Sequence, residues 1–224
     1  WDFYSRFIRQ AAGLGRSPKE RDPGRYERVN HHTDVLVVGA GPTGVQAAKV
    51  LAESGRDVMV IDMQASPGGH LLFHSCQIDT QPGVEWVSQA AVELRDRKNV
   101  TWLQNTTATG YYDHNMVIAV EHEPAESWLK ERLWHIRAKK VVIATGAVER
   151  PLIFPGNDRP GVMLADAAAR YIRRFAAVPG KRAVIYTNNS TTYAHLETFK
   201  AAGIEIQGIL DLRESLSETE LGLA

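Results

Sequence analysis

Three glycines at a fixed spacing are the first feature of the sequence that points to chemistry. Gly39, Gly41 and Gly44 form a G-x-G-x-x-G pattern in "DVLVVGAGPTGVQAAKVLAESG", after an apolar run and at the start of a helix-like stretch. Gly39 permits a tight strand-to-helix turn, Gly41 lets backbone approach a pyrophosphate, and Gly44 lets the helix pack close to the strand. The helix N-terminus then favours the negative charge of the ligand. The pattern predicts a dinucleotide site.

An acidic residue follows the next apolar run. Asp62 ends "DVMVID", where its carboxylate can hydrogen-bond an adenosine ribose diol and would repel a 2′-phosphate. NADP is therefore disfavoured, and Arg56 lies at the opposite end of that run. NAD and FAD share the adenosine pyrophosphate that the turn recognises, so these residues alone leave both cofactors open.

Two further segments carry small residues at positions where a cofactor needs space. "SPGGHLL" contains Gly69 in a glycine pair, which is predicted to lie over the dinucleotide or to form a plain turn. "VVIATGA" ends an apolar run in Ala144, Thr145 and Gly146, which leaves room for a cofactor or for a chain crossing between domains. A tightly packed core strand is the alternative for this second segment.

A second strand-turn-helix pattern begins at "RAVIYTNNSTTY", and its turn contains no glycine. Asn188, Asn189 and Ser190 can cap a helix, but the close backbone approach that Gly41 permits is not available. Asp211 stands where the ribose acid would be, with Arg213 two residues later. We expect a retained fold that has lost its ligand, with a working nucleotide site as the alternative.

No residue is nominated as catalytic or as a metal ligand. The single cysteine, Cys76, excludes an internal disulfide and a CxxC redox centre. Adjacent side chains of an extended segment point to opposite faces, which argues against a metal held by His31 and His32. The remaining acid–base candidates are explained more simply by a hairpin around an Asp-His-Asn turn: His74, Tyr111, Tyr112, Asp113 and His114.

The pattern of apolar runs and turns predicts how these residues are positioned. We expect an α/β fold: a doubly wound Rossmann-like dinucleotide-binding domain with a small antiparallel insert, then the start of a second, truncated Rossmann-like domain. The insert is assigned to "VTWLQNTTATGYYDHNMVIAVEHE". The expected divisions are an N-terminal arm with one short amphipathic helix, the first domain, a connection with a helix, and the start of the second domain: 1–32, 33–150, 151–180 and 181–224.

Composition limits the possible partners. The chain of 224 residues carries 26 Lys and Arg against 26 Asp and Glu, and this zero net charge argues against a nucleic-acid partner. No apolar run is long enough to cross a membrane and no signal peptide is visible, so a cytoplasmic location is expected by default. The chain begins at Trp1 and ends within its second unit, as expected of a piece of a longer protein.

Several longer segments resemble the α subunits of heterotetrameric sarcosine oxidases and of related amine and opine oxidases. They run from about Phe7 to Asn189 and comprise "FIRQAAGLG", "DVLVVGAGPTG", "TTATGYYDHNMV", "RAKKVVIATGAVERPLIFPGNDRPGVMLADAAARYI" and "AVIYTNN". The resemblance implies a two-dinucleotide-domain fold similar to disulfide reductases. It also implies NAD rather than FAD in the first site, a flavin-bearing partner subunit that oxidises a small amine, and FMN at a subunit interface.

The resemblance also places the cofactor contacts. They fall on Thr43, Asp62, Met63, Gln64 and His70, with a further contact at Thr107 or Ala108. Two of these positions depart from the family pattern. Met63 stands where the family usually has an acidic residue, and His70 replaces a small hydroxyl residue and could clash with a phosphate or bind it.

Three functions compete. The chain could be the nucleotide-binding part of a multi-subunit flavin-dependent amine oxidase or dehydrogenase, in which a partner performs the oxidation. It could be part of a self-sufficient FAD/NAD(P)H reductase, although the glycine-free second turn and the lone cysteine disfavour this. It could also be a non-catalytic scaffold that a bound nucleotide stabilises. We favour the first.

Overall fold

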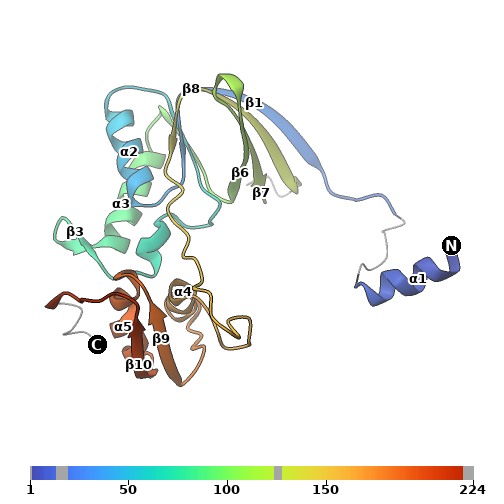
Figure 1. The fold of residues 1–224 in the computed structure, drawn as a ribbon. Helices are drawn as coiled ribbons and strands as arrows, with labels where there is room; N and C mark the ends of the chain where they lie inside the picture. Colours follow the sequence, from blue (N-terminus) through green and yellow to red (C-terminus); the bar gives the residue numbers. More distant parts are fainter. Residues whose placement is uncertain (1, 14–19, 124–127, 219–224) are drawn as a thin grey trace.

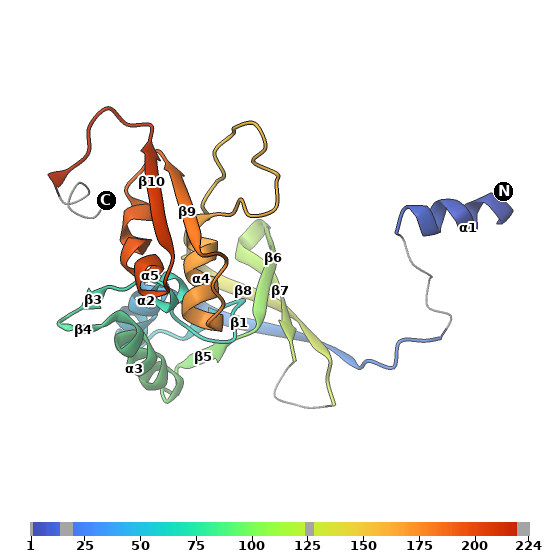
Figure 2. The ribbon, with the colours of Figure 1, turned by 90° about the horizontal axis from the view of Figure 1, so that it is seen from below.

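The computed structural model of the chain describes residues 2–13, 20–123 and 128–218. A short helix, α1 (Asp2–Ala11), precedes two α/β units and lies apart from both in the two views (Figures 1 and 2). This helix confirms the expectation of one amphipathic helix at the N-terminus. Its last turn is closed by a hydrogen bond from the Ala12 N–H to the Ile8 carbonyl, and Gly13 follows at φ +66°.

The first unit is built on a six-stranded sheet of order β5-β2-β1-β8-β7-β6. Strand β1 lies between β2 and β8 and is parallel to both, and β2 is parallel to β5. The β7 strand pairs antiparallel with β8 and with β6. The bounds of the six strands are β1 (Tyr26–Val38), β2 (Val58–Ile61), β5 (Val100–Leu103), β6 (Thr106–Tyr112), β7 (Met116–His122) and β8 (Glu131–Ile143).

Both faces of the central strands are buried, which is why their sequences are almost continuously apolar. Val35 and Val37 of β1 face two helices, α2 (Pro42–Glu53) and α3 (Gly83–Arg95), and join one core with them. Leu36 points to the opposite face, where it packs with Trp134 and Ile136 of β8. The antiparallel strands curve over this second face (Figure 1) and cover it in place of helices.

Two details of this sheet differ from the sequence-based expectation. Strand β1 begins at Tyr26, so residues 26–32, expected in the arm, pair with β8. These residues alternate between exposed and half-buried positions, and so few of them are apolar that the segment has the composition of a linker. Strand β5, expected in the antiparallel insert, is parallel to β2, and the antiparallel strands β6 and β7 extend the main sheet.

Short elements connect the strands and helices of the first unit. The 3-10 helix η1 (Gly69–Leu72) precedes a small hairpin of β3 (Gln77–Ile78) and β4 (Gln81–Pro82). The 3-10 turn η2 (Asp113–Asn115) joins β6 to β7, with His114 at φ +58°. This confirms the expected Asp-His-Asn turn.

The second unit starts with α4 (Ala165–Phe175), which packs on a parallel pair of strands and the helices between them (Figure 2). These elements are β9 (Arg182–Thr187), η3 (Thr191–His195), α5 (Leu196–Ala201) and β10 (Glu205–Asp211). Phe73 of the first unit is 2% exposed and lies in the core of the second. The predicted α/β Rossmann-like fold is confirmed, and no helix of the described residues is long and apolar enough to cross a membrane.

Candidate dinucleotide-binding site

The glycine turn links the end of β1 to the start of α2 and is packed too tightly for larger side chains. Gly39 has φ +106°, and a Cβ there would meet the backbone of Ala144 at the end of β8. A Cβ on Gly44 would meet the Gly39 carbonyl and would lie 3.3 Å from the Ala144 Cβ. The close helix-to-strand packing expected from Gly44 is therefore present.

A second glycine segment lies against this turn. The Gly68 N–H donates to the Ala40 carbonyl at 2.8 Å, and a Cβ on Gly69 would lie 3.2 Å from the Gly41 Cα. Gly69 also has φ +53°, where a side chain is strained. The structure thus places the glycine pair beside the turn, and the two segments form a backbone-lined cradle. Ligand contact by Gly69 stays a prediction.

The start of α2 suits an anionic ligand. Gly41 is the N-cap and has no side chain with which to cap the helix, and Pro42 has no N–H. The first backbone N–H that bonds within the turn is that of Val45, which donates to the Gly41 carbonyl at 2.9 Å. The N–H groups of Thr43 and Gly44 are the remaining first-turn donors, where helix geometry offers no internal partner. A pyrophosphate would supply the missing acceptors.

Asp62 follows β2 and closes the turn from the side. Its Oδ2 accepts the Ala40 N–H at 2.5 Å and its Oδ1 accepts the Gln64 N–H at 2.7 Å. Its backbone N–H donates to the Leu103 carbonyl at 3.0 Å, and its carbonyl accepts the Thr106 N–H at 2.8 Å. A carboxylate offers about four acceptor sites, so roughly two remain for ribose hydroxyls. Asp62 therefore organises the turn and keeps acceptor capacity for a ligand.

Met63 and Gln64 continue from Asp62 along the edge of the site. Met63 is 65% exposed. The Gln64 carbonyl accepts the Gln104 Nε2 at 2.6 Å and the Asn105 N–H at 3.2 Å, and Arg174 of α4 donates to its side-chain Oε1 at 3.2 Å. The sequence did not single out Gln104 or Asn105, although Asn105 at φ +50° marks the sharp turn between β5 and β6. These two residues position the segment that carries Asp62.

The contact carried over to Thr107 or Ala108 falls on β6. Thr107 pairs with Val120 and is half-buried, whereas Ala108 packs against the core on the second face of the sheet. The preceding residue, Thr106, donates its N–H to the Asp62 carbonyl beside the turn. Both expected contacts stay predictions.

Ala144, Thr145 and Gly146 follow β8 at the same edge. The Ala144 N–H donates to the Val38 carbonyl at 2.8 Å, and its side chain lies against the turn. Thr145 and Gly146 are exposed, and Gly146 has φ +76°. Ala144 is thus explained by packing, while its two neighbours begin the chain crossing toward α4.

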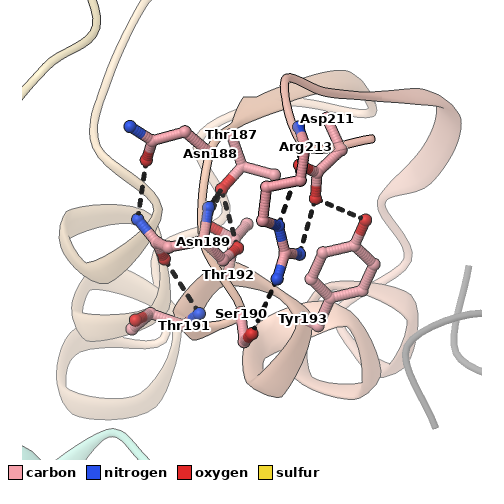
Figure 3. A network of polar contacts seen from close by, with 9 residues as sticks. All are labelled: Thr187, Asn188, Asn189, Ser190, Thr191, Thr192, Tyr193, Asp211 and Arg213. Carbon is pink, nitrogen blue, oxygen red and sulfur yellow. Dashed lines mark hydrogen bonds and ion pairs between the residues drawn. The ribbon is translucent and has the colours of Figure 1, made fainter. Parts of the chain in front are cut away.

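The second loop has a different architecture (Figure 3). Oδ1 of Asp211 accepts the backbone N–H of Arg213 at 2.9 Å and its Nε at 3.0 Å. Oδ2 accepts the Arg213 Nη2 at 2.7 Å and the Tyr193 hydroxyl at 3.0 Å. The hydrogen bonds from the Arg213 side chain hold the pKa of Asp211 far below its ordinary value. Arg213 also donates from Nη1 to the Ser190 Oγ at 3.0 Å and so crosses the loop.

A histidine cluster not foreseen from the sequence lies between the two units. It consists of His70, His74, Asp166 and His195, of which only His70 was expected at a site. Burial, and then repulsion from His195, lower the pKa of His74 below its ordinary value. Burial acts to raise the pKa of Asp166, but its hydrogen bond with His195 and the neighbouring histidine charges lower it overall. The four-residue spacing of His70 and His74 was the available signal.

Comparison with known proteins agrees with this geometry. Residues 33–186 match the family model described as pyridine nucleotide-disulphide oxidoreductase. The chain is 44% identical over 220 residues to the alpha subunit of sarcosine oxidase from Rhizobium meliloti (strain 1021), a match that covers 95% of the chain and 22% of that relative. It is 31% identical to one subunit of the opine oxidase from the same organism, over 80% of the chain and 38% of the relative. The predicted resemblance to sarcosine oxidase α subunits is confirmed.

A solved structure gives the same fold. L-proline dehydrogenase from P. horikoshii superposes with a TM-score of 0.68 at 26% identity, over 87% of the chain and 38% of that protein. The chain thus spans about a fifth of the length of the sarcosine oxidase relative and well under half of the other two proteins.

Proposed function

The chain belongs to the pyridine nucleotide-disulphide oxidoreductase family, and on this premise we propose that its glycine turn holds NAD within a multi-subunit flavin-dependent amine oxidase or dehydrogenase. The observation that carries the proposal is the turn itself. Gly39, Gly41 and Gly44 leave its backbone without side chains, and Asp62 lies beside it. The Asp62 carboxylate accepts two hydrogen bonds there and keeps further acceptor sites. An adenosine pyrophosphate requires this combination of features.

The residues fit such a ligand in distinct roles. The N–H groups of Thr43 and Gly44 at the start of α2 would bind the pyrophosphate, and Asp62 would accept hydrogen bonds from the adenosine ribose. The glycine pair at 68–69 would allow backbone approach from the other side. When bound, a nicotinamide dinucleotide supplies a ring that can accept or donate a hydride.

The preference for NAD over FAD rests on the likeness to the alpha subunit of sarcosine oxidase. The family's description supports a dinucleotide cofactor without naming the site that holds it. FAD stays the second candidate, because the turn binds the half of the dinucleotide that both cofactors share.

We assign amine oxidation to a flavin-bearing partner subunit, with FMN at a subunit interface. The basis is again the likeness to the alpha subunit of sarcosine oxidase, whose name identifies it as one subunit of an oxidase. The chain has one cysteine, which is exposed, and so has no disulfide pair of its own with which to act as a disulfide reductase. In the second loop, protein groups already donate four hydrogen bonds to the Asp211 carboxylate, which leaves it no acceptor site for a ribose. This disfavours a self-sufficient reductase, because such an enzyme needs two nucleotide sites. A small amine is the proposed substrate of the complex.

The test is to purify the intact protein with its co-purifying subunits, denature it, and identify the released nucleotides by chromatography and mass spectrometry. NAD together with FAD and FMN is the expected result. The Asp62→Ala variant should retain the flavins and release less NAD than the wild type, because the proposed NAD site is the one beside that carboxylate. Release of FAD alone from a protein without partners would overturn the NAD assignment and favour the self-sufficient reductase.

A further inference from the structure

The histidine cluster gathers four metal-ligand side chains from three separate segments. His195 at the end of η3 lies with its Nε2 2.8 Å from Oδ1 of Asp166. The Nε2 of His74 lies 3.6 Å from the same oxygen, and the Nε2 of His70 lies 3.4 Å from Oδ2. One carboxylate is therefore the common neighbour of three imidazoles.

The Nε2 of His195 lies within hydrogen-bond distance of Asp166, whereas the two longer separations in the cluster suit ligands that share a metal ion. Zinc bonds of 2.0–2.1 Å in tetrahedral geometry place neighbouring ligand atoms roughly 3.3 Å apart. The 3.4 and 3.6 Å separations match this value but are long for hydrogen bonds. The ligand atoms of His74, Asp166 and His195 all lie within 4.8 Å of one another.

The imidazole rings of His74 and His195 are largely buried and lie close together. The side chain of His195 is fully buried, and its Nδ1 has no hydrogen-bond partner among the described residues. The other ring nitrogen, Nε2, is the one that faces the Asp166 carboxylate. The rings of His74 and His195 lie with centroids 4.2 Å apart, so two charged rings would repel each other there.

The backbone holds the ligands in place. The His74 N–H donates to the His70 carbonyl at 2.8 Å, so the two residues are one helical turn apart and share a face. Asp166 lies in the first turn of α4, where its N–H donates to the Glu149 carboxylate at 2.9 Å. The His70 side chain is 41% exposed, so this member of the cluster lies at the surface.

We propose that His74, Asp166 and His195 bind a divalent transition-metal ion of the Zn²⁺ type, with His70 as the fourth ligand. The mixed imidazole and carboxylate donor set suits such an ion. Because the ligands come from η1 and its C-terminal end, from α4 and from η3, the ion ties the first unit to the second. The proposal goes beyond the dinucleotide site and shares only His70 with the expected contacts there.

The experiment measures Zn²⁺ binding to the intact protein with its co-purifying subunits. After stripping with a chelator, Zn²⁺ is titrated in competition with a chromophoric chelator, and bound Co²⁺ is followed by its visible absorption. The number of tightly bound Zn²⁺ ions per chain should be one lower in His74→Gln and in Asp166→Asn than in the wild type. The affinity loss should exceed the roughly 10- to 100-fold that loss of an outer-shell partner causes.

Two matched controls accompany these variants. His32→Gln removes an exposed histidine of β1 and should leave the stoichiometry unchanged. Asp62→Ala should also bind the ion normally, which separates this proposal from the assignment of NAD. Equal stoichiometry and affinity in His74→Gln, Asp166→Asn and the wild type would overturn the proposal.

A measurement on the unsubstituted protein covers the case in which a cluster variant fails to fold. X-ray absorption of the Co²⁺-loaded wild type should show nitrogen and oxygen ligands with imidazole scattering. Unfolding should occur at a higher temperature with the ion than without it, because a ligand that binds the native state stabilises it. A wild type that gains neither a bound ion nor thermal stability would equally refute the site.

Discussion

The two strand–loop–helix segments of the chain differ in what fills the loop. In the first, glycines leave the backbone bare and the carboxylate of Asp62 accepts two backbone N–H groups. In the second, the carboxylate of Asp211 accepts four hydrogen bonds, and the Arg213 side chain crosses to Ser190 (Figure 3). A carboxylate has about four acceptor sites, so only Asp62 can still receive a ribose hydroxyl. The same fold element thus stays open to a ligand in one unit and is closed in the other.

The largest effect on stability and NAD content is expected when a side chain is added at a glycine of the first loop. Gly44→Ala should lower the free energy of unfolding by roughly 1–3 kcal/mol, because the added Cβ meets the Gly39 carbonyl and forces the helix from the strand. NAD should be lost with it. Denaturant unfolding and nucleotide content measure both effects. Gly208→Ala in β10, whose Cβ would meet nothing within 4 Å, is the control and should change stability by less than about 0.5 kcal/mol.

Replacing the acidic residue of each loop, Asp62 or Asp211, tests directly which of the two loops binds NAD. Asp62→Ala should weaken NAD binding by roughly 1–3 kcal/mol, about 5- to 150-fold, because two backbone N–H groups and the ribose lose their acceptor. Asp211→Ala should leave NAD affinity unchanged. Calorimetric titration of the stripped intact protein compares the two variants. Equal losses in both would show that the second loop also takes part in binding.

The Arg213→Ala variant tests whether the ion pair between Asp211 and Arg213 stabilises the second loop, through the pH dependence of the free energy of unfolding. The native pKa of Asp211 is depressed, so its contribution to stability is present above its unfolded pKa of about 3.9 and is lost as pH falls toward the native pKa. The variant lacks this contribution. The stability difference between wild type and variant should therefore be constant from neutral pH down to about pH 4, decrease as the pH falls below about 3.9, and shrink with added salt. A difference that is independent of pH would contradict the role assigned to this ion pair.

The smallest effect is expected from adding a glycine to the second loop. Asn189→Gly removes the acceptor of the Thr191 N–H and should cost at most about 1 kcal/mol, because the bond is exposed. It should not create a second nucleotide site, since Asp211 stays saturated and Arg213 still reaches Ser190. The number of NAD molecules released per chain measures this. A rise above the wild-type value would mean that the missing glycine alone closes the loop.

Local patterns were sufficient to predict the glycine turn, Asp62 and the strands around them. The spacing of Gly39, Gly41 and Gly44 is recognisable because the strand, the turn and the helix are consecutive in the chain, although these glycines also meet Ala144 and Gly69 from distant segments. The second unit could be foreseen for the same reason, as could the lack of glycine in its loop. The start of β1 at Tyr26 could not, because those polar residues become a strand only through their pairing with β8.

Side-chain partners between distant segments were decided by the tertiary structure alone. The sequence shows Asp211 and Arg213 near each other, but their closure of the loop depends on Ser190 and Tyr193, which follow β9 and lie beside the end of β10. The histidine cluster is the extreme case, since its residues come from η1, α4 and η3, which are far apart in the chain and meet where Phe73 packs into the second core. Periodicity and turn spacing arise from neighbours along the chain, whereas such a cluster arises from packing, which no local pattern encodes.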